Sequence, residues 1–137
     1  MFRPTFWVGL LVVAAVAIGG ITLYALESGE VVLVRTIDPG GGVHEARVWI
    51  VDDAGYSWVE AADAGKLFYK RILDYPDVEV VRGDAVHRHR ALPVATDEAH
   101  ARMRELLAEK YGWADRWVGL FVDTSQSIPV RLGPRPL

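Results

Sequence analysis

Residues 5–26 read TFWVGLLVVAAVAIGGITLYAL, an uninterrupted run of 22 positions without a charged side chain. At a rise of about 1.5 Å per residue, a helix of this length extends about 33 Å, enough to cross the roughly 30 Å hydrocarbon core of a bilayer. Trp7 and Tyr24 lie near the two ends of the run, where aromatic side chains favour the membrane interface. We therefore predict a single-pass anchor over residues 1–28 that contacts the lipid bilayer through residues 5–26.

Two other interpretations of this run are a cleaved secretory signal and a buried helix of a soluble domain. A signal peptide has a more basic start and a small-residue cleavage site, whereas here Arg3 is the only basic side chain before the run and Tyr24-Ala25-Leu26-Glu27 is a poor processing site. A helix in a soluble core carries a polar face, which this run lacks. We favour the uncleaved anchor.

The basic residues around the run give a weak orientation signal. Arg3 precedes it, and the first basic residue after it is Arg35, which follows Glu27 and Glu30. Lys and Arg accumulate on the cytoplasmic side of a span, so the count mildly favours a cytoplasmic amino terminus and an outward-facing domain. The difference is one residue, so the sequence does not decide which side of the membrane the domain faces.

Residues 29–137 are enough for one domain with a single core. All 18 acidic residues but only 14 of the 15 Lys and Arg lie after the run, and this negative balance argues against nucleic acid as a partner. The chain has no cysteine, which excludes disulfides and thiolate metal sites. His87 and His89 share one face of a predicted strand, but no third ligand is identifiable, so we predict no metal site.

Short segments rich in β-branched residues alternate with turn residues in this domain. Helical spacing predicts one helix from Lys66 to Tyr75 and another after Thr96, whose side chain can cap it. Residues 113–122 are ambiguous and could form a short third helix. Six antiparallel strands close most economically into a small barrel. We therefore predict a β-rich α+β domain, a six-stranded antiparallel barrel with two to three helices. The expected strands are 30–37, 47–51, 56–60, 78–81, 85–94 and 128–132.

This order of elements, with the phrase KLFYKRILDYPDVEV at residues 66–80, resembles the split β-barrel family that binds flavin mononucleotide or a deazaflavin. The nearest branch looks like the deazaflavin-dependent nitroreductases and a sibling family of unknown function. The resemblance covers roughly residues 30–132 and implies a split barrel, one of these cofactors and a homodimer with the cofactor at its interface. The residues that carry it are Arg47, Trp49, Phe68, Tyr69, Leu73, Pro76, Val78 and Val80.

The resemblance also implies a site. Arg47 and Trp49 share one face of their strand, and Trp58 lies on the next strand. An indole could stack on the cofactor ring while Arg47 or Lys66 contacts its phosphate, and Tyr69 is the candidate catalytic residue that orients substrate or donates a proton. In the alternative interpretation, Trp49 and Trp58 belong to the barrel core and Arg47 is a cation at its rim.

Two functional hypotheses follow. The first is a membrane-anchored oxidoreductase that uses flavin mononucleotide or a deazaflavin to reduce a lipophilic acceptor, a quinone or a nitroaromatic compound. The second is a non-catalytic, membrane-tethered interaction module that has lost the cofactor. It is motivated by Asp38 and Glu45, which flank the turn where the nitroreductases carry a basic, phosphate-binding segment.

Overall fold

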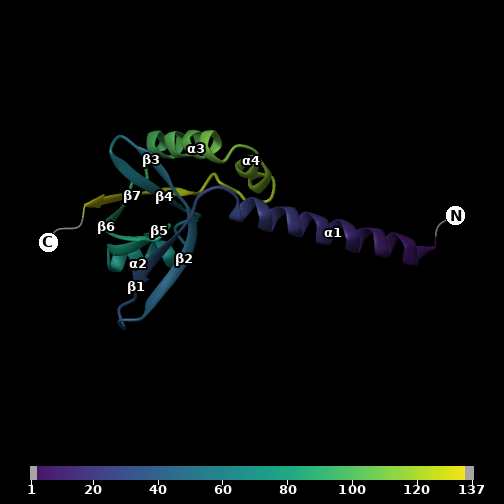
Figure 1. Cartoon of the computed structure of the whole chain (residues 1–137), viewed down its shortest axis with the longest axis horizontal. Helices are drawn as coiled ribbons and strands as arrows, with labels where there is room; N and C mark the ends of the chain where they lie inside the picture. Colours follow the sequence, from purple (N-terminus) through teal and green to yellow (C-terminus); the bar gives the residue numbers. More distant parts are fainter. Residues whose placement is uncertain (1–2, 135–137) are drawn as a thin grey trace.

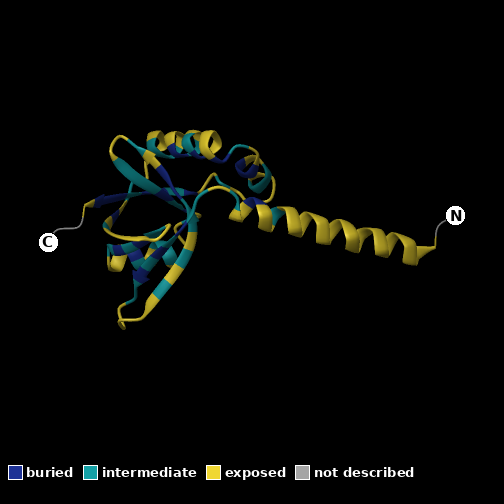
Figure 2. Cartoon of the chain, in the orientation of Figure 1, coloured by how far each residue is buried: buried dark blue, intermediate teal, exposed yellow. Residues whose placement is uncertain are grey.

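The computed structural model describes residues 3–134, which form one long helix and a curled antiparallel sheet with three shorter helices (Figure 1). The long helix, α1 (Pro4–Glu27), projects from the sheet and is exposed along almost all of its length (Figure 2). Its apolar window has a mean hydropathy of 2.4, and none of that window is buried, unlike a core helix. Within the described residues, α1 is the one helix long and apolar enough to span a membrane.

The sheet contains seven strands in the order β2-β1-β5-β6-β7-β4-β3. Each neighbouring pair is antiparallel. The strands are β1 (Val31–Ile37), β2 (Val43–Trp49), β3 (Val51–Asp53), β4 (Tyr56–Ala61), β5 (Asp77–Arg82), β6 (Ala85–Pro93) and β7 (Ile128–Pro134).

One continuous piece of chain forms both edges of this sheet. β2 and β3 are the two edge strands, yet only Ile50 separates them along the chain. The sheet therefore curls until its edges meet at Ile50, which makes it a split barrel. The predicted fold class is confirmed, with one difference: the strand expected at 47–51 is divided at Ile50, so the strands number seven rather than six.

Side chains from the third helix, α3 (Asp97–Tyr111), explain this division. The backbone N–H of Ile50 donates to the Tyr111 hydroxyl at 3.0 Å, and the Lys110 ammonium donates to the Ile50 carbonyl at 2.7 Å. Because the backbone N–H and C=O of Ile50 bond to side chains of α3, they cannot form the hydrogen bonds of a neighbouring strand. The alternation of residues in a strand does not reveal hydrogen bonds to side chains about sixty residues away. The division of the strand at Ile50 could therefore not be predicted from the sequence.

The barrel interior is filled by alternate residues of the strands, as the two-residue period requires. In β1, Val32, Val34 and Thr36 point inward and are almost fully buried. Helix α2 (Leu67–Asp74) adds Ile72 to the same core. The remaining members of this cluster are Ile50, Val59, Ala61, Val78, Val80, Ala91, Val130 and Leu132.

Helix α3 covers a second, smaller core outside the barrel. Thr96 caps it as predicted, because its hydroxyl accepts from the backbone N–H of Ala99 at 3.1 Å. Met103, Leu107 and Tyr111 pack against Val51. Gly112 then adopts a φ of +53°, a conformation that glycine tolerates best, and this turn separates α3 from α4 (Trp113–Gly119).

A cluster of charged side chains connects the segment after α1 to the barrel. The Arg82 guanidinium, on β5, donates to the carboxylates of Glu30 and Asp52 at 2.8 to 3.0 Å. Lys110 adds a second cation to Glu30 at 2.7 Å. These hydrogen bonds lower the pKa of Glu30 and of Asp52 to about 2 each. The charges therefore persist at neutral pH and fix the position at which the chain leaves α1.

Candidate functional site

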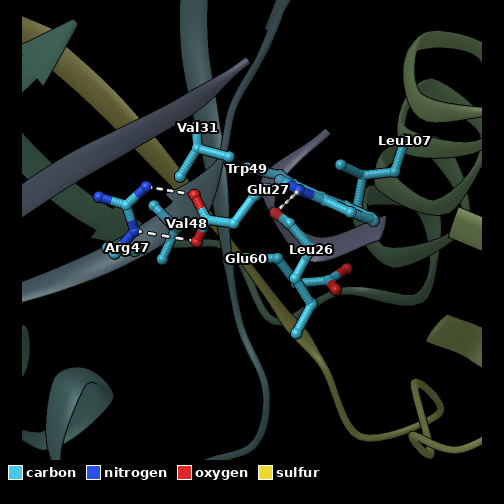
Figure 3. Close-up of a pocket in the computed structure, with 8 residues that line it drawn as sticks. All are labelled: Leu26, Glu27, Val31, Arg47, Val48, Trp49, Glu60 and Leu107. Atoms are coloured by element: carbon cyan, nitrogen blue, oxygen red, sulfur yellow. Dashed lines mark hydrogen bonds and ion pairs between the residues drawn. The ribbon is translucent and has the colours of Figure 1, made fainter. Parts of the chain in front are cut away.

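The candidate site is a pocket between the last turn of α1 and the barrel (Figure 3). Its volume is about 340 Å³, within the range of small-molecule sites. Apolar side chains supply most of its wall, and two carboxylates and one guanidinium are the charged groups. The lining residues are Leu26, Glu27, Val31, Arg47, Val48, Trp49, Glu60 and Leu107.

Trp49 forms the aromatic wall of this pocket and is held on two sides. Its ring stacks on the ring of Tyr111 with centroids 4.3 Å apart and planes 8° apart. Its Nε1–H donates to the Leu26 carbonyl at 3.0 Å, near the end of α1 (Figure 3). The indole therefore has a fixed orientation, and one of its two faces is covered by Tyr111.

Tyr111 itself is held by backbone groups on both sides of its hydroxyl. The hydroxyl donates to the Glu30 carbonyl at 2.5 Å and accepts from the Ile50 N–H. Burial raises the pKa of Tyr111 to about 12. The phenol thus stays protonated at neutral pH and acts as a positioning residue for Trp49.

Arg47 lies opposite Trp49 and forms a two-pronged ion pair with Glu27, the last residue of α1 (Figure 3). Both side chains are more than half exposed. An exposed ion pair of this kind contributes about 0–1 kcal/mol, so Arg47 can exchange Glu27 for another anion at little cost. Arg47 is therefore the group in this pocket that can meet a phosphate.

Glu60 is the second carboxylate of the pocket and has its own cation. Arg104, from α3, donates to Glu60 at 3.1 Å and to Asp115 at 2.5 Å. All three side chains are largely buried. Because Arg104 bonds to both Glu60 and Asp115, the triad connects β4, α3 and α4 beside the pocket.

The structure brings together Arg47 and Trp49 of the predicted cofactor residues. Trp58 lies on the same outer face of the barrel as Trp49, half-buried against Met103 and Leu106 of α3, but it does not line the pocket. The cavity beside it has a volume of about 30 Å³, too small for a planar ring system.

Lys66 and Tyr69 also lie outside the pocket lining. Lys66 is exposed at the start of α2, where the Asp63 carboxylate already accepts the backbone N–H of Gly65 at 2.7 Å. Tyr69 packs against the main barrel core. Their proposed roles in phosphate binding and catalysis stay predictions.

The two histidines of β6 have ring centroids 6.2 Å apart. Burial lowers the pKa of His89, whose Nδ1 lies 3.2 Å from the Gly133 carbonyl. Within residues 3–134, no group of three or more His, Asp or Glu residues is arranged to hold a metal ion.

The sequence did not identify Glu27 and Tyr111 as residues of the site. Glu27 follows the predicted span as a flanking charge, and Tyr111 lies in the helix predicted after Thr96, so neither pattern indicates a site. Both reach the pocket through contacts between distant segments, Glu27 with Arg47 and Tyr111 with Trp49. Residue spacing within one element cannot reveal such contacts.

No protein-family model matches the sequence, and no curated protein sequence is significantly similar to it. Solved structures are similar. The conserved hypothetical protein Rv2991 from Mycobacterium tuberculosis is 20% identical, with a TM-score of 0.62 over 86% of this chain and 80% of that one.

Two further structures resemble the chain. A Listeria innocua protein named for pyridoxamine 5′-phosphate oxidase is 14% identical, with a TM-score of 0.60 over 88% of this chain and 94% of that one. An F420-H2-dependent reductase, FDR-A, is 20% identical, with a TM-score of 0.57 over 74% and 92%. At these identities the similarity concerns the fold. The chain therefore has the split-barrel fold that its resemblance to flavin- and deazaflavin-binding proteins implied.

Proposed function

We propose that this protein is a membrane-anchored oxidoreductase that binds flavin mononucleotide or a deazaflavin and reduces a lipophilic acceptor of the quinone or nitroaromatic type. The observation that carries the proposal is the position of the pocket. Leu26 and Glu27, at the end of the apolar helix, form part of its wall, and Arg47 and Trp49 of the barrel form the rest. A pocket built in this way opens where a spanning helix leaves the bilayer.

The pocket fits the ring of such a cofactor. Its volume of about 340 Å³ and its apolar wall suit a planar aromatic system. A ring stacked on Trp49 would use the indole face opposite Tyr111, and the fixed indole would lose little conformational freedom on binding. Leu26 and Val31 would exclude water from the ring edge.

The phosphate of the cofactor could bind to Arg47 once this side chain releases Glu27. Arg47 is the available cation, and it must leave Glu27 to bind a phosphate in the two-pronged geometry that guanidinium favours. Glu60 does not compete for Arg47, because Arg104 already pairs with it. The phosphate would then lie at the exposed rim and the ring inside the pocket.

A bound flavin or deazaflavin supplies hydride transfer, and the protein supplies position and charge. In this proposal Trp49 orients the ring and Arg47 holds the phosphate. The apolar wall favours acceptors that partition into the bilayer. The resemblance of the fold to the F420-H2-dependent reductase FDR-A supports the same class of chemistry.

The test is a binding titration of full-length protein in detergent. We expect flavin mononucleotide or a deazaflavin to quench the tryptophan fluorescence, and Trp49→Leu and Arg47→Gln to weaken binding. Arg35→Gln is the matched control, because Arg35 lies in the same hairpin but pairs with Glu45 outside the pocket. If neither cofactor binds the wild-type protein, the proposal is wrong.

One observation favours the second candidate, a membrane-tethered module without cofactor. In the turn between β1 and β2, the Asp38 carboxylate accepts from the Gly42 N–H at 2.8 Å and pairs with His44 at 2.6 Å. Where the nitroreductases carry a basic turn, this chain thus has the Asp38 carboxylate, which is bonded to residues of its own turn. A reporter fused after Leu137 that is active only in the cytoplasm would favour the enzyme, and an external domain would favour the module.

A further inference from the structure

An exposed apolar segment follows α4. Leu120, Phe121 and Val122 are 74%, 56% and 47% exposed, and Trp113, at the start of α4, is exposed as well. Four large apolar side chains within ten residues form a surface that soluble domains usually cover. Asp123 ends the segment, and its carboxylate accepts from the Ser125 N–H at 2.9 Å.

Helix α4 is fixed to the end of α1. The Trp113 ring stacks on Tyr24 with centroids 5.8 Å apart. The Trp117 indole donates to the Thr22 hydroxyl at 2.9 Å. This bond gives the Trp117 N–H a partner, and the Thr22 hydroxyl itself donates to the Ile18 carbonyl at 2.7 Å. The two helices lie side by side in Figure 1.

The order of these contacts gives the direction of α4. Tyr24 follows Thr22 in α1, whereas its partner Trp113 precedes Trp117, so α4 runs back toward the amino terminus of α1. Thr22 lies five residues before Glu27, about 7 Å along the helix from its end. Phe121 lies at this level too, because its ring is 5.5 Å from that of Trp117.

We propose that residues 113–122 form a second membrane-contact element, with Leu120 and Phe121 inserted into the bilayer interface beside α1. The proposed occupant is lipid because the segment continues the exposed apolar surface of α1 rather than forming a separate patch. Trp113 and Trp117 are residue types that favour the membrane interface. The exposed Arg116 adds a cation at headgroup level.

This inference rests on the anchoring part of the proposed function and not on the cofactor. A single helix leaves a domain free to rotate about the span, whereas a second contact fixes its rotation. The candidate pocket includes Leu26 and Glu27, only a few residues after Thr22. The second contact would therefore hold the pocket opening at the bilayer surface, where a lipophilic acceptor arrives.

The test uses single-cysteine variants of the full chain, which has no native cysteine. Phe121→Cys and Leu120→Cys carry an environment-sensitive fluorophore in liposomes of phosphatidylcholine and phosphatidylglycerol. Leu23→Cys, on the exposed face of α1, reports the anchor. Val43→Cys, an exposed position in the distant hairpin, is the aqueous control.

We expect blue-shifted emission, and quenching by spin-labelled lipids, at positions 120, 121 and 23, and neither at position 43. If position 23 is quenched while 120 and 121 behave like 43, the second contact is wrong although the anchor holds. If position 23 also behaves like 43, the anchor is wrong, and the inference with it. Cofactor binding does not enter either readout.

Discussion

The Trp49 indole lies flat on the Tyr111 ring, with the planes 8° apart and the centroids 4.3 Å apart. Because the Tyr111 hydroxyl also bonds to backbone groups of Ile50 and Glu30, one phenol connects the aromatic wall of the pocket, the point where the barrel closes and the segment after α1. Stability and site geometry therefore depend on the same side chain.

Tyr111→Phe tests this connection. The variant keeps the ring stack but leaves the buried N–H of Ile50 without its partner, which costs about 1–3 kcal/mol of unfolding free energy. Denaturant unfolding in detergent, followed by tryptophan fluorescence, measures the loss. Tyr75→Phe, at an exposed position after α2, should change little. Equal stability of the two variants would show that the Tyr111 hydroxyl contributes nothing.

The fold could largely be predicted from local patterns. Thr96 predicts the start of α3, and the β-branched residues of 30–37 predict β1, because these signals act within a few residues. The break at Ile50 could not be predicted, because it depends on Tyr111 and Lys110 of a distant helix.

The Arg104 triad gives a second prediction. Arg104→Gln leaves Glu60 and Asp115 unpaired in a largely buried place and should destabilise the protein by about 3 kcal/mol. Arg102→Gln is the matched control on the same helix, because Arg102 is 48% exposed and its ion pair should contribute at most about 1 kcal/mol. Similar losses in both variants by denaturant unfolding would contradict the structural role of Arg104.

The Arg82 cluster predicts a dependence of stability on pH. Glu30 and Asp52 have folded pKa values of about 2, below the ordinary values of about 4 in an unfolded chain. The stabilisation is therefore complete above about pH 5 and is lost as the pH falls toward 2. Arg82→Gln should make the unfolding free energy depend less on pH in this range, whereas Arg88→Gln, on the neighbouring strand, should leave the dependence unchanged. Parallel profiles for wild type and Arg82→Gln between pH 6 and 3 would refute the assignment.

The candidate site was predictable only where its residues share one strand. Arg47 and Trp49 are two positions apart on β2, so strand alternation placed them together correctly. Trp58 shares the outer face of the barrel with Trp49, but its side chain packs under α3 and does not line the pocket. The packing of α3 over β4 decides this position, and residue spacing within a strand does not reveal it.

The ion pair between Arg47 and Glu27 leads to the sharpest prediction about binding. Glu27→Gln removes the anion that competes for Arg47 and should tighten flavin mononucleotide binding about fivefold, equivalent to about 1 kcal/mol. Riboflavin, which has the same ring without the phosphate, should bind as before. Glu45→Gln is the matched control, because its carboxylate pairs with Arg35 outside the pocket. If riboflavin tightens equally, the effect acts on the ring and Arg47 does not hold the phosphate.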